Sequence, residues 1–438
     1  MSKKVCMFVW NHFTNDARVL RECSALTEVG YEVDLIAIHN WKDEQLAKEE
    51  QHPNGFRIIR VNNRMNSLLR SIRFIKKVKK KKIEMMLLFL ITFNILLNLE
   101  VITNWFGVTI YFSLLALAGI LIFALTKTKI PTLMVRGYIF SQMVRYGRKK
   151  KYDFYHSNDL NTLMQGVLSA KWLRRKKLIY DSHEVQTSRT GYNSPIYGIM
   201  ERVLLWFVDE IITENHTRAK YHDDRYGHYP NVVHNYPIPT NPEKSSAINL
   251  AELLQIEQDE PILLYQGGIQ TGRGLEKIVE AVPMMERGTV VFIGDGRLKP
   301  ELVNMVAERN LEHRIKFIPK VPVDELLHYT KHAYLGFQVL NNVCFNHYSA
   351  SSNKLFEYMM SGVPVIACSF PEIQKVVEEE KIGVCVDSHE PASIAQGVNY
   401  LLNHPEVRER MSVNCLHARN KYNWRKEKEV FIEIYESA

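Results

Sequence analysis

Short apolar runs alternate along the chain with longer segments in which apolar positions recur at helical spacing. The runs 5–10, 32–38 and 56–61 are rich in β-branched residues, which predicts buried strands. Between the first two, the apolar positions of 19–26 fall on one helical face, and Gly30 ends the segment. This order of strand, helix and strand predicts a parallel sheet in an α/β domain.

The same scheme continues after residue 150 and again after a proline-rich stretch at 237–242. Further strands are predicted at 153–159, 178–184, 210–213, 232–235, 261–266, 289–293, 316–318, 334–339 and 363–367. The prolines therefore predict a boundary between an N-terminal domain, 1–238, and a second Rossmann-like domain, 239–418. The first strand-to-helix loop lacks the G-x-G-x-x-G fingerprint, which argues against a dehydrogenase.

Two long apolar segments, at about 83–126, interrupt the first domain. The basic run Arg73–Lys82 precedes them, and Lys127 and Lys129 follow them. Each segment is long enough to cross a bilayer, and cations at both outer ends are typical of cytoplasmic flanks. We expect a membrane hairpin whose two ends stay cytoplasmic. A shallow re-entrant or interfacial hairpin and a pair of core helices are the alternatives.

Composition describes a folded protein of more than one domain: 438 residues, 46% hydrophobic, 24% charged, with a formal net charge of +8. The six cysteines form no CxxC pair and no metal-ligand spacing, which suits a reducing cytoplasm. No signal peptide is expected. The basic run abuts apolar segments and lacks interleaved aromatics, so a membrane surface is a better partner for it than nucleic acid. We therefore expect a cell-membrane protein whose catalytic domains lie on the cytoplasmic side.

The stretch 351–367 combines a polar loop, a short helix, a glycine stop and a strand. Residues Ser351, Ser352 and Asn353 offer N-caps and helix-start amides, a common anion site. Glu357 lies one turn further on, and Gly362 suits the helix end. An ordinary structural unit of an α/β domain would look the same, so this stretch alone decides nothing.

Three other stretches follow predicted strands and carry candidate chemistry. The glycine-rich loop 267–274 contains Arg273, and a Gly-Asp-Gly turn lies at 294–296. Glycine amides and an arginine can hold a diphosphate, although tight turns explain the glycines equally well. His183 and Glu184 end a strand, where a histidine can face a substrate or be purely structural.

The order and spacing of these motifs resemble GT-B glycosyltransferases, specifically the retaining family 4. Gly267-Gly with Arg273-Gly-Leu, Phe292-Ile-Gly-Asp-Gly296 and the run 353–367 resemble the family's donor-site motifs. Asn15-Asp-Ala-Arg-Val-Leu and Asp181-Ser-His-Glu184 resemble its acceptor-side motifs. The similarity covers nearly all of the chain except about 65–145.

The resemblance implies two Rossmann-like domains that face each other across a cleft, with 419–438 as a helix crossing back to the first. It implies that His183, Arg273 and Glu357 are catalytic. The implied donor-binding residues are Gly267, Gly268, Arg273, Gly294, Gly296, Lys320, Val321, Ser352, Asn353, Lys354, Leu355 and Glu357. The implied acceptor-side residues are Asn11, Thr14, Asn15, Arg18 and Glu184.

The chain departs from the family pattern at three points. Ser349 stands where the first acid of the E-x7-E motif is expected, and Gly268 stands where an arginine is usual. The glycine pair of the first loop is replaced by 11–15. These departures bear on the contact with the donor sugar, so the sequence does not identify the sugar.

We expect a retaining glycosyltransferase that uses a UDP- or GDP-linked sugar and needs neither a cofactor nor a metal. The acceptor would be a saccharide or, given the hairpin, a lipid-linked molecule of envelope polysaccharide or glycolipid synthesis. A GT-B sugar-nucleotide epimerase and a non-catalytic membrane-bound partner subunit remain the alternatives.

Overall fold

The computed structural model describes residues 2–14, 16–40, 43, 45–61, 129–172, 174–188, 195–239, 248–322 and 325–438. These residues divide into two compact units. Unit 1 comprises 1–17, 26–157 and 161–176, and unit 2 comprises 18–25, 158–160 and 177–438. The expected hairpin at 83–126 and the basic run before it lie outside the described residues. Within those residues, no helix has the length and apolar character that a membrane crossing needs.

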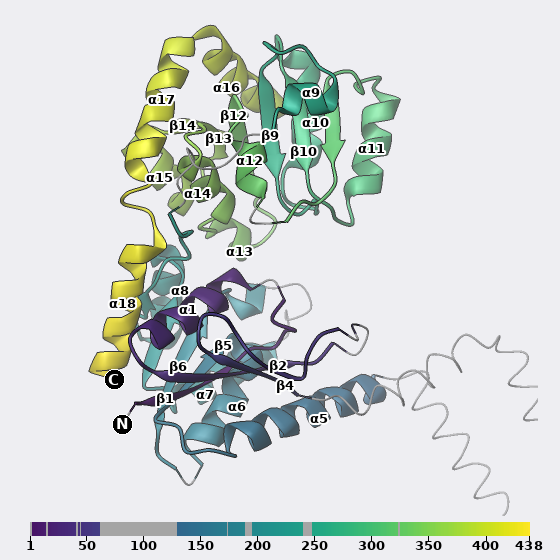
Figure 1. Ribbon diagram of the computed structural model, residues 1–438. Coiled ribbons are helices and arrows are strands. Elements are labelled where there is room, and N and C mark those ends of the chain that lie inside the picture. Colours follow the sequence, from purple (N-terminus) through teal and green to yellow (C-terminus); the bar gives the residue numbers. More distant parts are fainter. Residues whose placement is uncertain are drawn as a thin grey trace, which may run out of the picture. The chain divides into compact units, whose positions relative to one another are not determined.

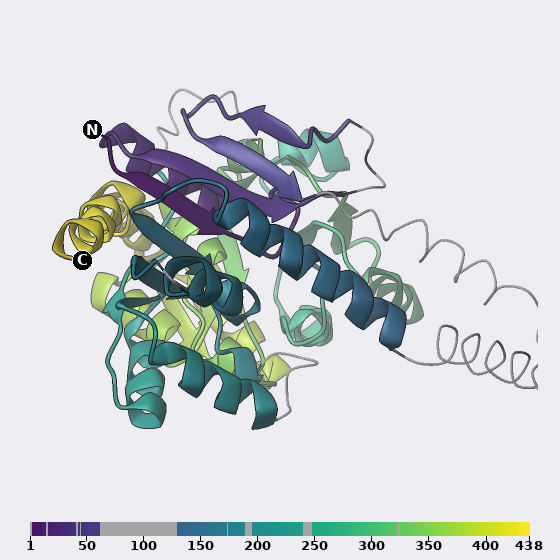
Figure 2. The ribbon, with the colours of Figure 1, turned by 90° about the horizontal axis from the view of Figure 1, so that it is seen from below.

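Unit 1 is built on a mostly parallel sheet whose strands follow the order β3-β4-β2-β1-β5. Their bounds are β1 Lys4–Phe8, β2 Glu32–Ile38, β3 Glu49–Gln51, β4 Arg57–Val61 and β5 Phe154–Asn158. Strand β3 pairs antiparallel with β4 and was not predicted, because its three charged or polar residues carry no apolar signal. Among the described residues of this unit, three helices begin or end: α1 Ala17–Glu28, α5 Ile130–Gly147 and α6 Leu160–Ala170. Helix α5 packs against β2 and β4 through Val135, Ile139 and Met143 (Figure 2).

Unit 2 contains parallel strands in the order β6-β7-β8 and a separate six-stranded sheet, β11-β10-β9-β12-β13-β14. The strands are β6 Lys177–Ser182, β7 Glu210–Thr213, β8 Asn231–Val232, β9 Ile262–Gln266, β10 Thr289–Ile293, β11 Ile315–Ile318, β12 Leu335–Gln338, β13 Val365–Cys368 and β14 Gly383–Val386. The helices are α7 Pro195–Leu205, α8 His216–Tyr226, α9 Leu250–Leu254, α10 Leu275–Ala281, α11 Lys299–Glu308, α12 Leu326–Thr330, α13 Phe345–Tyr348, α14 Asn353–Met360, α15 Pro371–Glu380, α16 Pro391–Asn403, α17 Pro405–Ala418 and α18 Trp424–Ser437.

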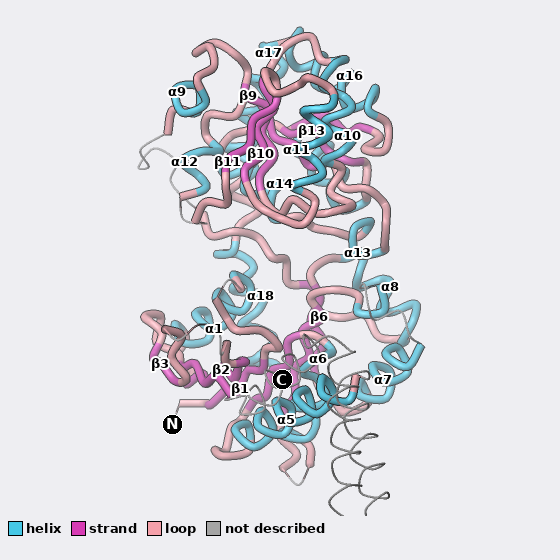
Figure 3. Tube along the Cα trace, turned by 90° about the vertical axis from the view of Figure 1, so that its right-hand side faces the viewer, coloured by secondary structure: helices cyan, strands magenta, loops and turns pink. Residues whose placement is uncertain are grey.

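Helices cover both faces of the six-stranded sheet (Figures 1 and 3). Side chains alternate along β9, as a strand requires: Leu263 and Tyr265 join one buried cluster, and Ile262 and Leu264 join the other. The first cluster includes residues of α10, α11 and α16, and the second includes residues of α14, α15 and α17. Burial on both faces explains why these strands read as continuous apolar runs.

Helix α14 ends where the sequence predicts. Gly362 has a φ of 71°, and the Val363 amide donates to the Tyr358 carbonyl at 3.0 Å, closing the helix end. The strand that follows begins at Val365, two residues later than expected, because Val363 belongs to this closure. The predicted parallel α/β architecture is confirmed.

Candidate functional site

Two glycine loops meet at the carboxyl edge of the six-stranded sheet, where parallel α/β folds bind ligands. Gly294 follows β10 with a φ of 150°, and a Cβ there would lie 1.9 Å from the Gly267 carbonyl oxygen. A Cβ on Gly296 would lie 2.0 Å from the Ile269 carbonyl oxygen. Only glycine permits this approach, so the loops are fixed against each other by their backbones.

The start of α14 lies at the same edge. Ser352 occupies the N-cap position, but its hydroxyl donates to Gln338 Oε1 at 3.0 Å and does not cap the helix. Of the expected amides, that of Leu355 donates to the Ser352 carbonyl at 3.0 Å, and the Leu355 side chain is buried in the core. The first amides of a helix have no acceptor one turn back, so they suit an anion such as a diphosphate.

Glu357 is held in place by Gln266, a residue that no sequence motif predicted. Its Oε2 accepts from Gln266 Nε2 at 2.8 Å, and Gln266 Oε1 accepts from Thr330 Oγ1 at 2.7 Å. Gln266 is the last residue of β9, directly before the glycine loop. The only signal in the sequence is a buried polar residue that ends an otherwise apolar strand.

Lys354 and Arg273 give this edge its positive charge. A Cβ built on Gly267 would lie 3.5 Å from Lys354 Cδ, and Lys354 Nζ lies 5.4 Å from the ring centre of Tyr265. Burial, together with the positive charge of Arg273, lowers the pKa of Lys354 to about 7. An anion bound beside Lys354 would favour the charged form of that lysine.

The remaining donor-side residues surround this edge. The Gly294 amide donates to the Ile318 carbonyl at 3.1 Å, so Lys320 and Val321 follow a strand that ends beside the glycine turn. A Cβ on Gly268 would meet only Gln270 Cγ, at 3.6 Å.

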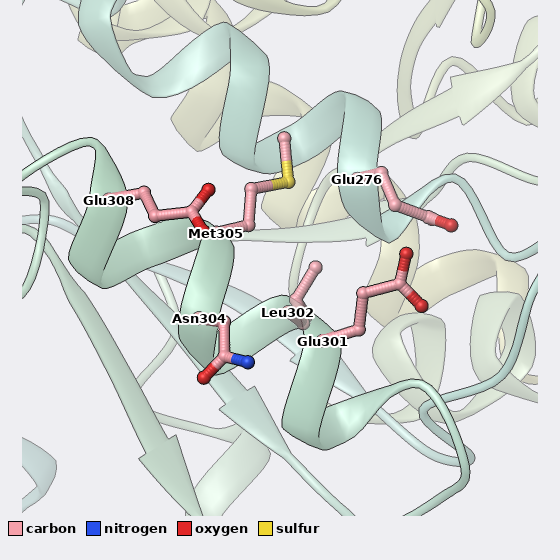
Figure 4. A pocket seen from close by; sticks show the side chains of 6 residues that line it. All are labelled: Glu276, Glu301, Leu302, Asn304, Met305 and Glu308. Atoms are coloured by element: carbon pink, nitrogen blue, oxygen red, sulfur yellow. The ribbon is translucent and has the colours of Figure 1, made fainter.

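A pocket of about 470 Å³ lies elsewhere in unit 2, between α10 and α11. Figure 4 shows the carboxylates of Glu276, Glu301 and Glu308 around it. Three carboxylates would repel a nucleotide diphosphate. The pocket is therefore an unsuitable place for such a donor, and the glycine edge is the better one.

His183 follows β6 in a cluster of buried charges. Arg18 Nε and Nη2 donate to the two carboxylate oxygens of Asp181 at 2.8 and 2.9 Å, and His183 Nε2 lies 3.1 Å from Asp181 Oδ2. Arg18 Nε also lies 3.0 Å from Glu22 Oε1. Asp181 and Glu22 are fully buried, and the His183 side chain is 18% exposed.

These neighbours set three protonation states. Burial disfavours the imidazolium of His183, but the Asp181 carboxylate outweighs this and raises its pKa to about 10. Burial alone would raise the pKa of Asp181, but the charge of Arg18 holds it well below the usual range. Burial and then the charge of Asp181 raise the pKa of Glu22 well above its usual value. His183 is therefore a cation at neutral pH.

Glu22, Asp181 and His183 are also the group that, among the described residues, brings three possible metal ligands within 4.8 Å of one another. The guanidinium of Arg18 donates to both oxygens of Asp181, so a fixed positive charge already lies where a metal ion would bind. We therefore interpret the cluster as the support that keeps His183 charged and oriented.

The segment after His183 is tied to α13 and to position 349. The Val185 amide donates to Asn346 Oδ1 at 2.8 Å, and Asn346 Nδ2 returns a bond to the Val185 carbonyl at 3.1 Å. Arg218 Nε donates to Ser349 Oγ at 3.2 Å, and Arg218 also donates to the His183 carbonyl. Ser349 is fully buried, so this position, where the family's first acid was expected, faces Arg218 here.

The acceptor-side residues fall into both units. In unit 1, Asn11 Nδ2 donates to Asp16 at 2.8 Å, and Thr14 is exposed. Asn15 lies outside the described residues. In unit 2, Arg18 is directed to Asp181, and Glu184 is partly buried beside His183. Their role toward an acceptor stays a prediction.

Helix α18, expected to cross back to the first domain, 1–238, contacts residues of that range that belong to unit 2. The Trp424 amide donates to the Pro237 carbonyl at 3.0 Å, and Glu427 Oε2 accepts from the His234 amide at 2.8 Å. Arg21 lies over the Trp424 ring at 5.6 Å. These contacts join the last helix to the segment that follows β8 and to α1.

Comparison with known proteins places these features in a family context. Residues 249–415 match the model of the family described as glycosyl transferases group 1. An uncharacterized glycosyltransferase of Methanocaldococcus jannaschii is 23% identical over 66% of this chain and 76% of its own length. The chain spans 40% and 44% of the length of two other curated relatives, an alpha-D-kanosaminyltransferase of Streptomyces kanamyceticus and a D-inositol 3-phosphate glycosyltransferase of Thermomonospora curvata.

Solved structures share the fold at low identity. Sucrose-phosphate synthase from Thermosynechococcus elongatus superposes with a TM-score of 0.71 at 16% identity, covering 99% of this chain and 98% of that one. Anabaena HepE in complex with UDP gives 0.67 at 13% identity, with 100% of both chains covered. The fold is thus GT-B-like, and within it the segment 249–415 is similar to group 1 glycosyl transferases.

Proposed function

We propose that the protein transfers a sugar from a nucleotide-diphosphate sugar to an acceptor with retention of configuration. The observation that carries this proposal is the edge at which the interlocked loops of Gly267 and Gly294, the start of α14 and the cations Arg273 and Lys354 come together. Such an edge suits a diphosphate, and Glu357, oriented by Gln266, suits the ribose hydroxyls.

In this reaction the bond between the anomeric carbon and the diphosphate oxygen breaks as the acceptor oxygen bonds to that carbon on the same face. The leaving diphosphate takes the acceptor proton. Arg273 and Lys354 stabilise the negative charge that develops on the diphosphate. The imidazolium of His183 donates a hydrogen bond to a hydroxyl of the donor sugar.

UDP-linked sugars are the first donors to test, because several structural neighbours are described as complexes with UDP or UDP-glucose. For the acceptor we propose a lipid-linked molecule at the cytoplasmic leaflet, in envelope polysaccharide or glycolipid synthesis. The support for it is the run of apolar segments at 83–126 and the cations of 73–82 in the sequence.

The test is a screen of UDP- and GDP-sugars with the full-length protein, in which nucleotide release and the mass and anomeric configuration of the product are measured. Glu357→Ala should weaken donor binding about tenfold to a hundredfold, because it removes the carboxylate that would accept hydrogen bonds from the ribose hydroxyls. Glu276→Ala, in the acidic pocket between α10 and α11, is the matched control and should bind donor as the parent does.

Three outcomes would contradict parts of the proposal. Conversion of the donor sugar without an acceptor would identify an epimerase. Donor binding without turnover across soluble and lipid-linked acceptors would identify a partner subunit. Turnover of soluble acceptors alone would remove the lipid-linked acceptor and leave the transfer reaction standing.

A further inference from the structure

Unit 1 contains a basic pocket that the transfer reaction does not use. It has a volume of about 610 Å³, within the range of small-molecule sites. It is lined by Lys48, Glu49, Arg60, Tyr138, Gln142, Arg145, Tyr146 and Lys149. Arg60 is already paired with Glu50, which leaves Lys48, Arg145 and Lys149 against the carboxylate of Glu49, so the pocket favours an anion.

Arg60 forms the fixed part of this pocket. It is 4% exposed and donates to the His12 and Ala47 carbonyls at 3.0 and 2.9 Å, while Nη1 pairs with Glu50 at 2.7 Å. Its guanidinium therefore cannot swing away from the wall. Arg145 is exposed on α5, Lys149 is exposed two residues beyond the end of that helix, and both side chains are long enough to close on a ligand.

The pocket residues of α5 share one helical face with apolar residues further upstream. Tyr138, Gln142 and Arg145 follow one another at four- and three-residue spacing, and Met134 and Ile130 lie one and two turns before Tyr138. Met134 and Ile130 are each 44% exposed, whereas the core side of the helix is buried. From the start of α5 to its end, the side chains on this face are therefore first apolar, then aromatic, then an amide and finally a cation.

The length of this face matches a lipid. Met134 and Arg145 are separated by about 16 Å along the helix, from a rise of about 1.5 Å per residue. Half of a bilayer's hydrocarbon core is about 15 Å thick. Moreover, Ile130, the first residue of α5 and 44% exposed, follows closely on the apolar sequence that ends at Leu125.

We propose that this pocket binds the phosphate head group of an anionic glycerophospholipid, with Arg145 and Lys149 on the phosphate and the acyl chains along Ile130 and Met134. The site fixes the orientation of unit 1 at a membrane surface. It goes beyond glycosyl transfer and does not depend on which sugar or acceptor is used.

The test uses the full-length protein and short-chain lipids below their micelle concentration, with binding measured by calorimetry. Dihexanoyl-phosphatidylglycerol should bind, and Arg145→Gln should weaken it about tenfold, as loss of one charge-assisted contact predicts. Glu49→Gln should tighten it, because the one carboxylate of the lining is removed.

Arg136→Gln is the matched control, since Arg136 is exposed on the same helix but does not line the pocket. An equal loss with Arg136→Gln would show a diffuse electrostatic effect and overturn the site. Equal binding of dihexanoyl-phosphatidylcholine, or inorganic phosphate binding as tightly as the lipid, would overturn the anionic lipid as ligand. UDP binding, measured in parallel, should be the same in all variants, so a failure here is separable from a failure of the proposed transfer reaction.

Discussion

The glycine edge and the His183 cluster, both in unit 2, are built by different forces. At the glycine edge, backbones approach so closely that Gly294 admits no side chain. At His183, buried side chains carry the structure: Arg18, Asp181 and Glu22 hold one another in an interior with little water. The first arrangement is marked in the sequence by glycine motifs. The second leaves ordinary charged residues that are far apart in the chain.

The two regions should respond differently to single substitutions. At the glycine edge an added side chain would collide with backbone atoms that cannot move aside. Near His183, the loss of one charge can be offset by a change in protonation of the remaining neighbours. Substitution of a close-approach glycine should therefore cost more than substitution of one charge.

The largest effect is expected for Gly294→Ala. The new Cβ would meet the Gly267 carbonyl at 1.9 Å, in a backbone conformation that L-residues avoid. We expect a loss of about 4 kcal/mol in the free energy of unfolding, measured by urea denaturation, and loss of UDP binding. Gly268→Ala is the control. Its Cβ would meet only Gln270 Cγ, so the change should stay within about 0.5 kcal/mol. Equal costs for the two variants would contradict the close-approach interpretation.

Asp181→Asn should come next. It leaves the guanidinium of Arg18 buried without its full counter-charge, which costs about 3 kcal/mol of unfolding free energy. Glu22 offsets part of this, because its pKa falls once the neighbouring charge is gone. A normal urea midpoint in Asp181→Asn would refute the buried ion pair.

The same variant tests the charge of His183. In the parent, the imidazolium contributes stability that is fully present below its unfolded pKa, about 6.5, and is lost as the pH rises through about 10. NMR titration of the His183 ring should show that Asp181→Asn lowers this pKa, since Asp181 is the leading cause that raises it. An unchanged titration would mean that another group sets the charge.

The smallest effect concerns Lys354. Its pKa of about 7 means that it is largely neutral above that pH in the free protein, and a bound diphosphate would restore its charge. UDP affinity should be constant below pH 7 and fall about tenfold per pH unit at most above it. Lys354→Arg, always charged, should flatten this dependence. A parent curve that is flat between neutral and alkaline pH would remove Lys354 from the diphosphate site.

Much of the fold could be predicted from the sequence because its signals are local. The apolar runs 32–38, 210–213 and 289–293 coincide with β2, β7 and β10. Strand β3 escaped prediction because an edge strand of Glu49–Gln51 buries no apolar side chain.

The candidate site was predictable only in part. Glu357 and the glycines stood in recognisable motifs, yet Gln266, which orients Glu357, lies 91 residues away in sequence. In the sequence, Ser349 stands where a donor motif usually has an acid, whereas in the structure its hydroxyl accepts a hydrogen bond from Arg218. The Ser352 hydroxyl, a natural N-cap by position, is taken by Gln338. Such competition between partners depends on which elements pack together.

The sequence by itself determined the parallel α/β architecture, the glycine turns at strand ends and the concentration of cations, because residue type and spacing fix backbone conformation and burial locally. Only the tertiary structure decided which charges meet. The pairing of Arg18 with Asp181, the charged state of His183, the lowered pKa of Lys354 and the lining of the basic pocket on α5 all follow from distances between remote residues. Electrostatic energies depend on those distances and on burial, and neither quantity is written in the order of the residues.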